Sequence, residues 1–256
     1  MVYNFFEVMN MDYLSVFKPH IYEDEFARLP YRLFSPNIVE GEKYPLVVFL
    51  HGAGERGDDN ERHIIANEGA TTWTNPEFQK KHPCFVFAPQ CPENGYWGTS
   101  FRVHKDMEKL GPNSLIAIVA IIIEQLTESL PIDKDRIYVT GLSMGGFGTL
   151  SLLTLCPNKF AAGVVICGGG NPHKMNKIAH IPLWFFHAED DTVVPVSYSR
   201  TLVEELKKLC AEVRYTEYPA GYMSSLGLSP HASWVPAYRD SGMKEWLFSK
   251  KRVQTV

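Results

Sequence analysis

Short apolar runs recur along the chain, and each ends at glycine, proline or a polar residue. The runs are four to six residues long and rich in β-branched and aromatic side chains. That pattern is typical of strands buried on both faces of a parallel sheet. We expect such strands at residues 45–50, 84–88, 136–140, 162–167 and 183–186.

Helical patterns lie between these runs. Residues 114–130 and 144–155 each end just before a proline, and residues 197–209 carry apolar side chains at helical spacing with charges between them. Alternating strands and helices imply a mostly parallel central sheet with helices on both faces. The sequence therefore predicts an α/β fold, with residues 1–256 forming a single domain.

Three parts of the chain depart from this alternation. Val16-Phe17 and residues 31–34 are β-like and separated by polar and proline positions, which indicates an antiparallel N-terminal lead-in. Residues 55–80 and 91–112 are polar excursions with scattered aromatic residues. Loops of that length are uncommon in compact domains and tend to be lids, binding loops or excursions that contain short helices. We expect both near the functional site, at the carboxyl ends of the strands.

The composition excludes several classes of protein. With 45% hydrophobic and 21% charged residues, the chain is neither disordered nor collagen-like. Its 25 basic and 29 acidic residues give a net charge of −4, without the basic excess of a nucleic-acid binder. The five cysteines form no Cys-x-x-Cys pair, so a zinc site or a dithiol redox site has little support. An odd number of scattered cysteines suits a protein of a reducing compartment.

Targeting and membrane signals are not evident. Residues 1–14 contain acids but no Lys or Arg, unlike the start of a signal peptide. The longest apolar run, residues 115–123, has nine residues, whereas a bilayer needs about 20. We therefore expect a cytoplasmic protein with neither a membrane nor a nucleic-acid partner.

The sharpest chemical motif is Gly141-Leu-Ser143-Met-Gly145, which separates a predicted strand from a predicted helix. A serine exposed at such a sharp turn needs a strained backbone and very small neighbours two positions away. The alternative is a glycine-rich structural turn or a nucleotide loop. However, the glycines do not have the dinucleotide spacing, and no acid between Asp135 and Glu189 is available for a ribose. We predict that Ser143 is a nucleophile.

A serine nucleophile needs a base and a group that orients the base. The acidic loop after residues 183–186 offers Asp190 and Asp191. Of nine histidines, only His231 follows that loop. Serine, acid and histidine in this order match one known arrangement of a catalytic triad.

Backbone N–H groups must also bind the oxyanion that such chemistry creates. Met144 directly follows the nucleophile and supplies one N–H group. Residues 51–57 follow an early strand and are small enough for their backbone to approach a substrate oxygen. We expect Ala53 to be the second donor, with Gly54 as the alternative, and His51 to hold the loop.

Five motifs in this order resemble the serine esterases of the α/β-hydrolase superfamily. The similarity is to feruloyl-esterase-like, acetyl-xylan-esterase-like and predicted-peptidase-like carboxylesterases, and it extends over residues 50–234. The motifs are LHGAGERG, APQCPENGYW, GLSMGGFGT, HAEDDTVVP and PHASW.

The resemblance implies an α/β-hydrolase fold with Ser143 as nucleophile, His231 as base and Asp191 as orienting acid. Asp191 is implied over Asp190 because it begins the family's Asp-x-x-Val-Pro pattern. Two features depart from the family: Ala188 replaces a glycine after His187, and the stretch before His231 is longer than usual.

These residues predict a serine carboxylesterase that works without cofactor or metal, through an acyl-enzyme. The expected substrates are small-molecule or oligosaccharide esters with short acyl or feruloyl-type aryl groups, including fragments of plant polysaccharide. We expect Trp97, Trp73 and Gln90 to line the substrate pocket; for Trp97 and Trp73 the alternative is a satellite core beneath a long loop. The alternatives are a peptidase or amidase of the same fold and a non-catalytic binding protein. No oligomeric state follows from the sequence.

Overall fold

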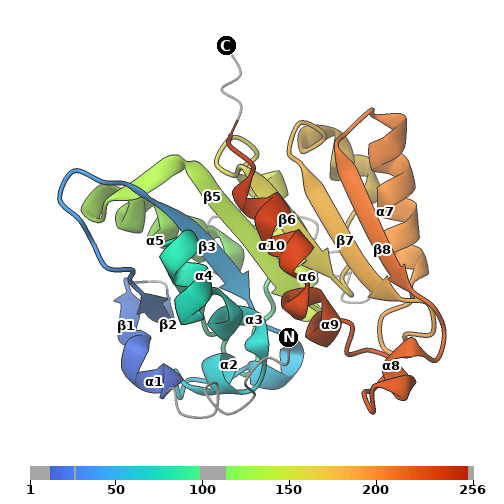
Figure 1. Cartoon of the computed structure of the whole chain (residues 1–256), viewed down its shortest axis with the longest axis horizontal. Coiled ribbons are helices and arrows are strands. Elements are labelled where there is room, and N and C mark those ends of the chain that lie inside the picture. The colour runs from blue at the N-terminus through green and yellow to red at the C-terminus, as the bar shows by residue number, and fades with distance from the viewer. Residues whose placement is uncertain (1–11, 26, 99–113, 253–256) are drawn as a thin grey trace.

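An eight-stranded sheet runs through the protein (Figure 1). The computed structural model describes residues 12–25, 27–98 and 114–252. The strand order is β1-β2-β4-β3-β5-β6-β7-β8. The strands are β1 (Lys18–Glu23), β2 (Arg28–Phe34), β3 (Tyr44–Leu50), β4 (Phe85–Pro89), β5 (Ile132–Leu142), β6 (Ala162–Ile166), β7 (Leu183–Ala188) and β8 (Val213–Tyr218).

The sheet is antiparallel only at its N-terminal side. β2 pairs antiparallel with both β1 and β4, and every pair from β4 to β8 is parallel. This confirms the predicted mostly parallel sheet with an antiparallel start. The expectation of a strand at Val16-Phe17 was wrong: Val16 ends a helical turn, and β1 begins at Lys18.

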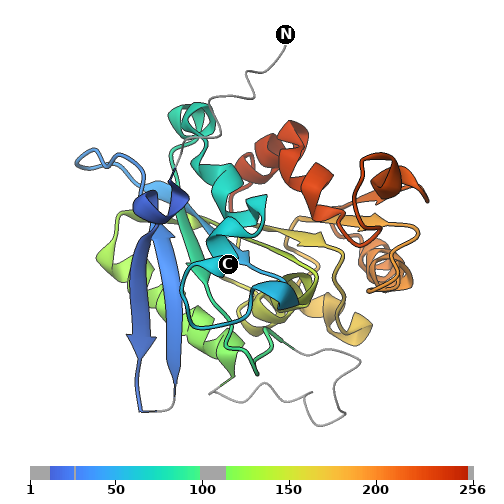
Figure 2. The same cartoon turned by 90° about the horizontal axis from the view of Figure 1, so that it is seen from below.

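Helices cover both faces of the sheet, as Figure 2 shows. Helices α5, α6 and α7 pack on one face, and α2, α3, α4, α9 and α10 pack on the other. The helices are α1 (Tyr13–Val16), α2 (Arg62–Ile65), α3 (Glu68–Thr71), α4 (Pro76–Lys81), α5 (Leu115–Ser129), α6 (Met144–Leu155), α7 (Ser197–Lys208), α8 (Tyr222–Ser225), α9 (Trp234–Arg239) and α10 (Ser241–Phe248).

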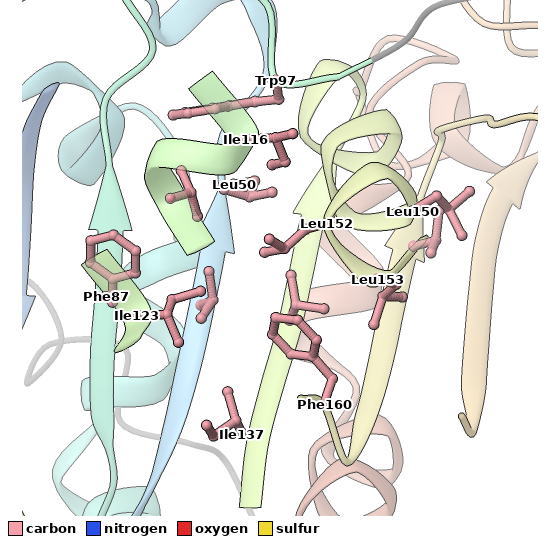
Figure 3. Close-up of a cluster of buried hydrophobic side chains, with 14 of the residues drawn as sticks. Leu50, Phe87, Trp97, Ile116, Ile123, Ile137, Leu150, Leu152, Leu153 and Phe160 are labelled. Atoms are coloured by element: carbon pink, nitrogen blue, oxygen red, sulfur yellow. The ribbon is translucent and has the colours of Figure 1, made fainter. Parts of the chain in front are cut away.

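The interior strands explain the continuous apolar runs in the sequence. Along β3, Val48 and Leu50 enter the core beneath α5 and α6, whereas Val47 and Phe49 enter the core on the opposite face. Successive side chains of a strand point to opposite faces, so a strand covered on both sides has no polar positions. Figure 3 shows the first of these cores, where Ile123 of α5 lies among strand residues.

Two edge strands differ from the sequence pattern, and the two excursions have separate outcomes. β1 and β8 were not predicted, because their side chains are largely exposed or half-buried and alternate with polar residues. The excursion at residues 55–80 contains the short helices α2 and α3 and most of α4, which agrees with the expected short-helix alternative. Of the second excursion, only residues 91–98 belong to the described part of the chain.

Within residues 12–25, 27–98 and 114–252, no helix is both long enough and apolar enough to cross a bilayer.

Two isoleucines of α5 offer a direct test of the core. Ile123 is fully buried, whereas Ile121 is 41% exposed on the same helix. We expect Ile123→Ala to lower the free energy of unfolding by about 2–5 kcal/mol, because it leaves a cavity. The matched Ile121→Ala should change it by less than about 0.5 kcal/mol. Urea denaturation of both variants measures the difference, and equal effects would contradict the packing described.

Candidate active site

Ser143 lies at the turn between β5 and α6, at the carboxyl edge of the sheet. Its backbone has φ 53° and ψ −118°, a left-handed conformation that is uncommon for a residue with a Cβ atom. Such strain costs on the order of 1–3 kcal/mol and persists only where the surroundings enforce it. Helix α6 begins at Met144, so its partially positive N-terminus lies beside the Ser143 side chain.

The glycines of the motif are required by close backbone contacts. A Cβ atom on Gly145 would lie 1.8 Å from the carbonyl oxygen of Leu50 in β3. One on Gly141 would lie 2.3 Å from the carbonyl oxygen of Gly145. Helix α6 therefore approaches β3 and β5 at distances that only glycine permits, and this approach sets the turn at Ser143.

The structure brings together Ser143, His231 and Asp191. His231 Nε2 lies 2.9 Å from Ser143 Oγ, and His231 Nδ1 lies 2.7 Å from Asp191 Oδ2. A carboxylate only accepts hydrogen bonds, so Nδ1 carries the hydrogen and a neutral His231 can accept at Nε2. The three residues come from the ends of β5 and β7 and from the loop before α9.

The Asp191 carboxylate is completely buried and fully hydrogen-bonded. Its Oδ1 accepts from the N–H groups of Val193 and Val194, and its Oδ2 also lies 3.2 Å from His187 Nε2. Burial alone would raise the pKa of Asp191, but the hydrogen bonds from the two histidines and the two backbone groups lower it well below its ordinary value. Asp191 is therefore ionised at neutral pH.

The neighbouring acids have a different role. Asp190 Oδ2 accepts from the N–H group of Gly221, and Glu189 Oε2 accepts from that of Ala220. These bonds attach the long stretch that precedes His231 to the acidic loop. Of the two aspartates that the sequence left open, only Asp191 contacts the imidazole of His231.

The loop after β3 lies beside Ser143. Leu50 pairs with Gly141 in adjacent parallel strands, so the chain leaves β3 and β5 at the same edge. A Cβ atom on Gly52 would contact Leu142, the residue before Ser143. Ala53 follows and begins an exposed 3₁₀ turn.

His51 ties this loop to its surroundings. Its Nδ1 donates to the carbonyl oxygen of Gly52, its Nε2 accepts from the N–H group of Cys91, and its carbonyl oxygen accepts from Trp97 Nε1. Burial lowers the pKa of His51 to about 4, so the ring is neutral at pH 7 and can accept at Nε2. His51 thus joins the ends of β3 and β4.

Gln90 was expected to line the substrate pocket and is instead fully buried and bonded to protein groups. Its side chain is fully buried and accepts from the N–H group of Asn60 while donating to Asp59 Oδ1 and the carbonyl oxygen of Glu55. All of these contacts hold residues 55–60 against the end of β4, so Gln90 anchors a loop.

Trp97 was also expected in the pocket and is instead a core residue. Its side chain is fully buried, and its indole N–H donates to the carbonyl oxygen of His51. Figure 3 places its ring near Ile116 of α5 and Leu50 of β3. It packs edge-on against the His51 ring, with centroids 5.2 Å apart.

Trp73 likewise belongs to the core on the opposite face of the sheet. It is fully buried among the rings of Phe78, Tyr238 and Phe248. Its indole N–H donates to the carbonyl oxygen of Gly69. The pocket assignment was wrong because aromatic residues in a long excursion can fold back onto the sheet as readily as they line a site.

Sequence reasoning missed two side chains at the site. Trp234 packs edge-on against the His231 ring, with centroids 5.3 Å apart. Its position three residues after His231 was the available signal. The second is His187, which contacts Asp191. The two residues are four positions apart across the end of β7, and that spacing did not indicate the contact.

One group of side chains among the described residues has donor atoms close enough to hold a metal ion. Cys167, Asp191 and His231 place their donors within 4.8 Å of one another. The 2.7 Å hydrogen bond between Asp191 and His231 occupies the space between two of these ligands. The group therefore belongs to the hydrogen-bonded site already described.

The parallel sheet with its antiparallel start, together with the serine at the sharp turn after β5, defines an α/β-hydrolase fold. The chain belongs to the phospholipase/carboxylesterase family, whose sequence pattern matches residues 36–227.

Individual relatives agree with this family. A thermostable esterase of known structure is 46% identical with a TM-score of 0.89, and the match covers 94% of this chain and 64% of that one. A poly(3-hydroxyoctanoate) depolymerase from Pseudomonas fluorescens is 29% identical over 161 residues, covering 55% of this chain and 54% of the depolymerase.

A bifunctional acetylxylan esterase/xylanase from Neocallimastix patriciarum is 34% identical over 77 residues, which are 30% of this chain and 11% of that enzyme. The chain thus spans about half the length of the depolymerase and about a tenth of the bifunctional enzyme.

Gly145→Ala tests the close approach of α6 to β3. The new methyl group would overlap the Leu50 carbonyl oxygen, so backbone must move, and we expect a loss of about 3 kcal/mol in unfolding free energy. Gly54→Ala is the matched control for stability, because nothing lies within 4 Å of its added Cβ atom. Thermal and urea unfolding measure both, and a Gly145→Ala protein as stable as the control would contradict this account.

Proposed function

We propose that the protein is a serine carboxylesterase that hydrolyses carboxylic esters. The observation that carries the proposal is the continuous hydrogen-bond path from Ser143 Oγ through the His231 ring to Asp191. A hydroxyl becomes a useful nucleophile when a base takes its proton and a third group orients that base. Membership of the phospholipase/carboxylesterase family supports the same reaction class.

In the first step, Ser143 Oγ attacks the ester carbonyl carbon as His231 Nε2 takes the hydroxyl proton. The resulting imidazolium is stabilised by the ionised Asp191 carboxylate at Nδ1. His231 then gives the proton to the leaving alcohol, and the acyl group remains on Ser143. In the second step, His231 takes a proton from water, whose oxygen attacks the acyl carbon. The bond from that carbon to Ser143 Oγ then breaks, His231 returns the proton to Oγ, and the acid is released.

The oxyanion of each tetrahedral intermediate needs donors on the side opposite the base. We assign the N–H groups of Met144 and Ala53 to this role, with Gly54 as the alternative to Ala53. Met144 is the first residue of α6, so its N–H group is not used by the helix's own hydrogen bonds. The close approach of Gly52 to Leu142 supports the assignment of Ala53 as a donor, because it holds the loop after β3 beside Ser143.

For the substrate, we propose esters with a short acyl or an aryl, feruloyl-type acyl group, including those borne by oligosaccharides. The similarity to an enzyme described as an acetylxylan esterase and to a polyester depolymerase supports an ester bond in a polymer or its fragments. We also propose the cytoplasm as its location, supported by five cysteines that are all free thiols.

Ser143→Ala tests the mechanism directly. Removing the hydroxyl should lower kcat on p-nitrophenyl acetate by about 10⁴–10⁶-fold, since the remaining groups cannot form the acyl-enzyme. Labelling by a fluorophosphonate probe should disappear, while circular dichroism stays unchanged. Ser35→Ala, at an exposed serine outside the site, is the control and should keep full activity. Undiminished turnover in Ser143→Ala rules out the mechanism.

A substrate panel separates the proposed esterase from the two alternatives. We expect turnover of acetyl, alkyl or feruloyl esters at rates at least about 100-fold above those of peptide amides of matched acyl group, because the amine is a poorer leaving group than the alcohol. Faster cleavage of the amides would favour a peptidase. A protein that the fluorophosphonate probe leaves unlabelled would instead favour a non-catalytic binding protein.

A further inference from the structure

We propose that His187, held by Ser199, is a positioning residue that fixes the Asp191 carboxylate in the orientation in which it binds His231. The inference rests on the proposed function and concerns residues that the mechanism above does not use. Neither His187 nor Ser199 contacts the nucleophile, so both act through Asp191.

The His187 ring is completely buried at the end of β7. Its Nε2 lies 2.9 Å from the carbonyl oxygen of Val194 and 3.2 Å from Asp191 Oδ2. Both partners can only accept hydrogen bonds, so Nε2 carries a hydrogen that the two oxygens share. Without that hydrogen, two buried acceptor oxygens would face the lone pair of Nε2 with no donor between them.

Ser199 determines the orientation of the ring. Its hydroxyl group, on α7, is fully buried and lies 2.8 Å from His187 Nδ1. A neutral ring with hydrogen on Nε2 has a lone pair on Nδ1, which accepts from the Ser199 hydroxyl. The imidazole is therefore held at both nitrogens, by α7 on one side and by the acidic loop on the other.

This arrangement completes the shell around Asp191. The Val193 and Val194 N–H groups hold Oδ1, and His187 and His231 both hold Oδ2. A carboxylate that accepts four bonds in fixed directions cannot rotate, so the lone pair of Oδ2 stays directed at His231 Nδ1. Partners that orient metal ligands in this way typically contribute about 10–100-fold to activity, and we expect a loss of similar size for the Asp191 carboxylate.

Two amide substitutions separate positioning from packing. In His187→Gln, the amide nitrogen can occupy the place of Nε2 and still donate to Asp191 and Val194. In His187→Asn, the shorter side chain reaches only the place of Nδ1, near Ser199, and the donor to Asp191 is lost. The two variants share their chemistry and differ by one methylene group.

We expect His187→Asn to lower kcat on p-nitrophenyl acetate about 10–100-fold, with KM within about twofold of wild type. His187→Gln should stay within about fivefold of the wild-type kcat. Equal losses in both variants, or a loss confined to KM, would overturn the positioning role and leave only a packing role for the ring.

Ser199→Ala provides a second route should His187→Asn fail to fold. It removes the partner of Nδ1 while leaving His187 and Asp191 in place, and we expect kcat to fall about three- to tenfold with KM unchanged. A wild-type kcat in folded Ser199→Ala would overturn the role of Ser199. The proposed esterase activity is tested separately, by the loss of wild-type turnover in Ser143→Ala. A normal kcat in His187→Asn would therefore contradict the positioning role of His187 and leave the proposed esterase activity intact.

Discussion

The close approach of α6 to β3 is the constraint on which the site depends. Gly145 lies against the Leu50 carbonyl oxygen at a distance that excludes a side chain. The contact forces the chain to turn sharply after β5, and Ser143 is left half-buried in a strained conformation, with its hydroxyl beside His231. The same contact brings the end of β3 beside the nucleophile. One backbone contact therefore positions both Ser143 and the loop to which we assign an oxyanion donor.

The remaining parts of the site are joined to this centre by hydrogen bonds between loops that leave the same edge of the sheet. His51 connects the end of β3 to the loop after β4, and Gln90 fastens residues 55–60 to the end of β4. Asp190 connects the acidic loop to the stretch before His231. The His51 bond is buried, the Gln90 bond is partly buried and the Asp190 bond is exposed, and together they hold the loops against one another and against the strand ends.

The sequence predicted the interior of the fold better than its edges or its pocket. Strands such as β3 are buried on both faces and read as continuous apolar runs, whereas β1 and β8 lie at the edges and have no such run. The order and spacing of motifs pointed to Ser143, His231 and Asp191, which the fold brings into contact.

The sequence could not place three other side chains in the same way: Trp73, Trp97 and Gln90. A buried aromatic or amide side chain has the same appearance in a sequence whether it packs in a core or faces a ligand.

The buried side chains of His51 and Asp191 show how hydrogen-bond partners determine where the site carries a negative charge. His51 loses solvation and gains no anionic partner at hydrogen-bond distance, so burial keeps it neutral and available as an acceptor for the Cys91 N–H group. Asp191 is equally buried but receives four donors, so it keeps its negative charge. The fixed negative charge thus lies behind His231, where positive charge would develop in the proposed mechanism, while the N-terminus of α6 would face the oxyanion of that mechanism. In that mechanism the positive charge on His231 and the negative charge on the oxyanion form on opposite sides of Ser143. Neither His51 nor Asp191 has to reorganise for this to happen.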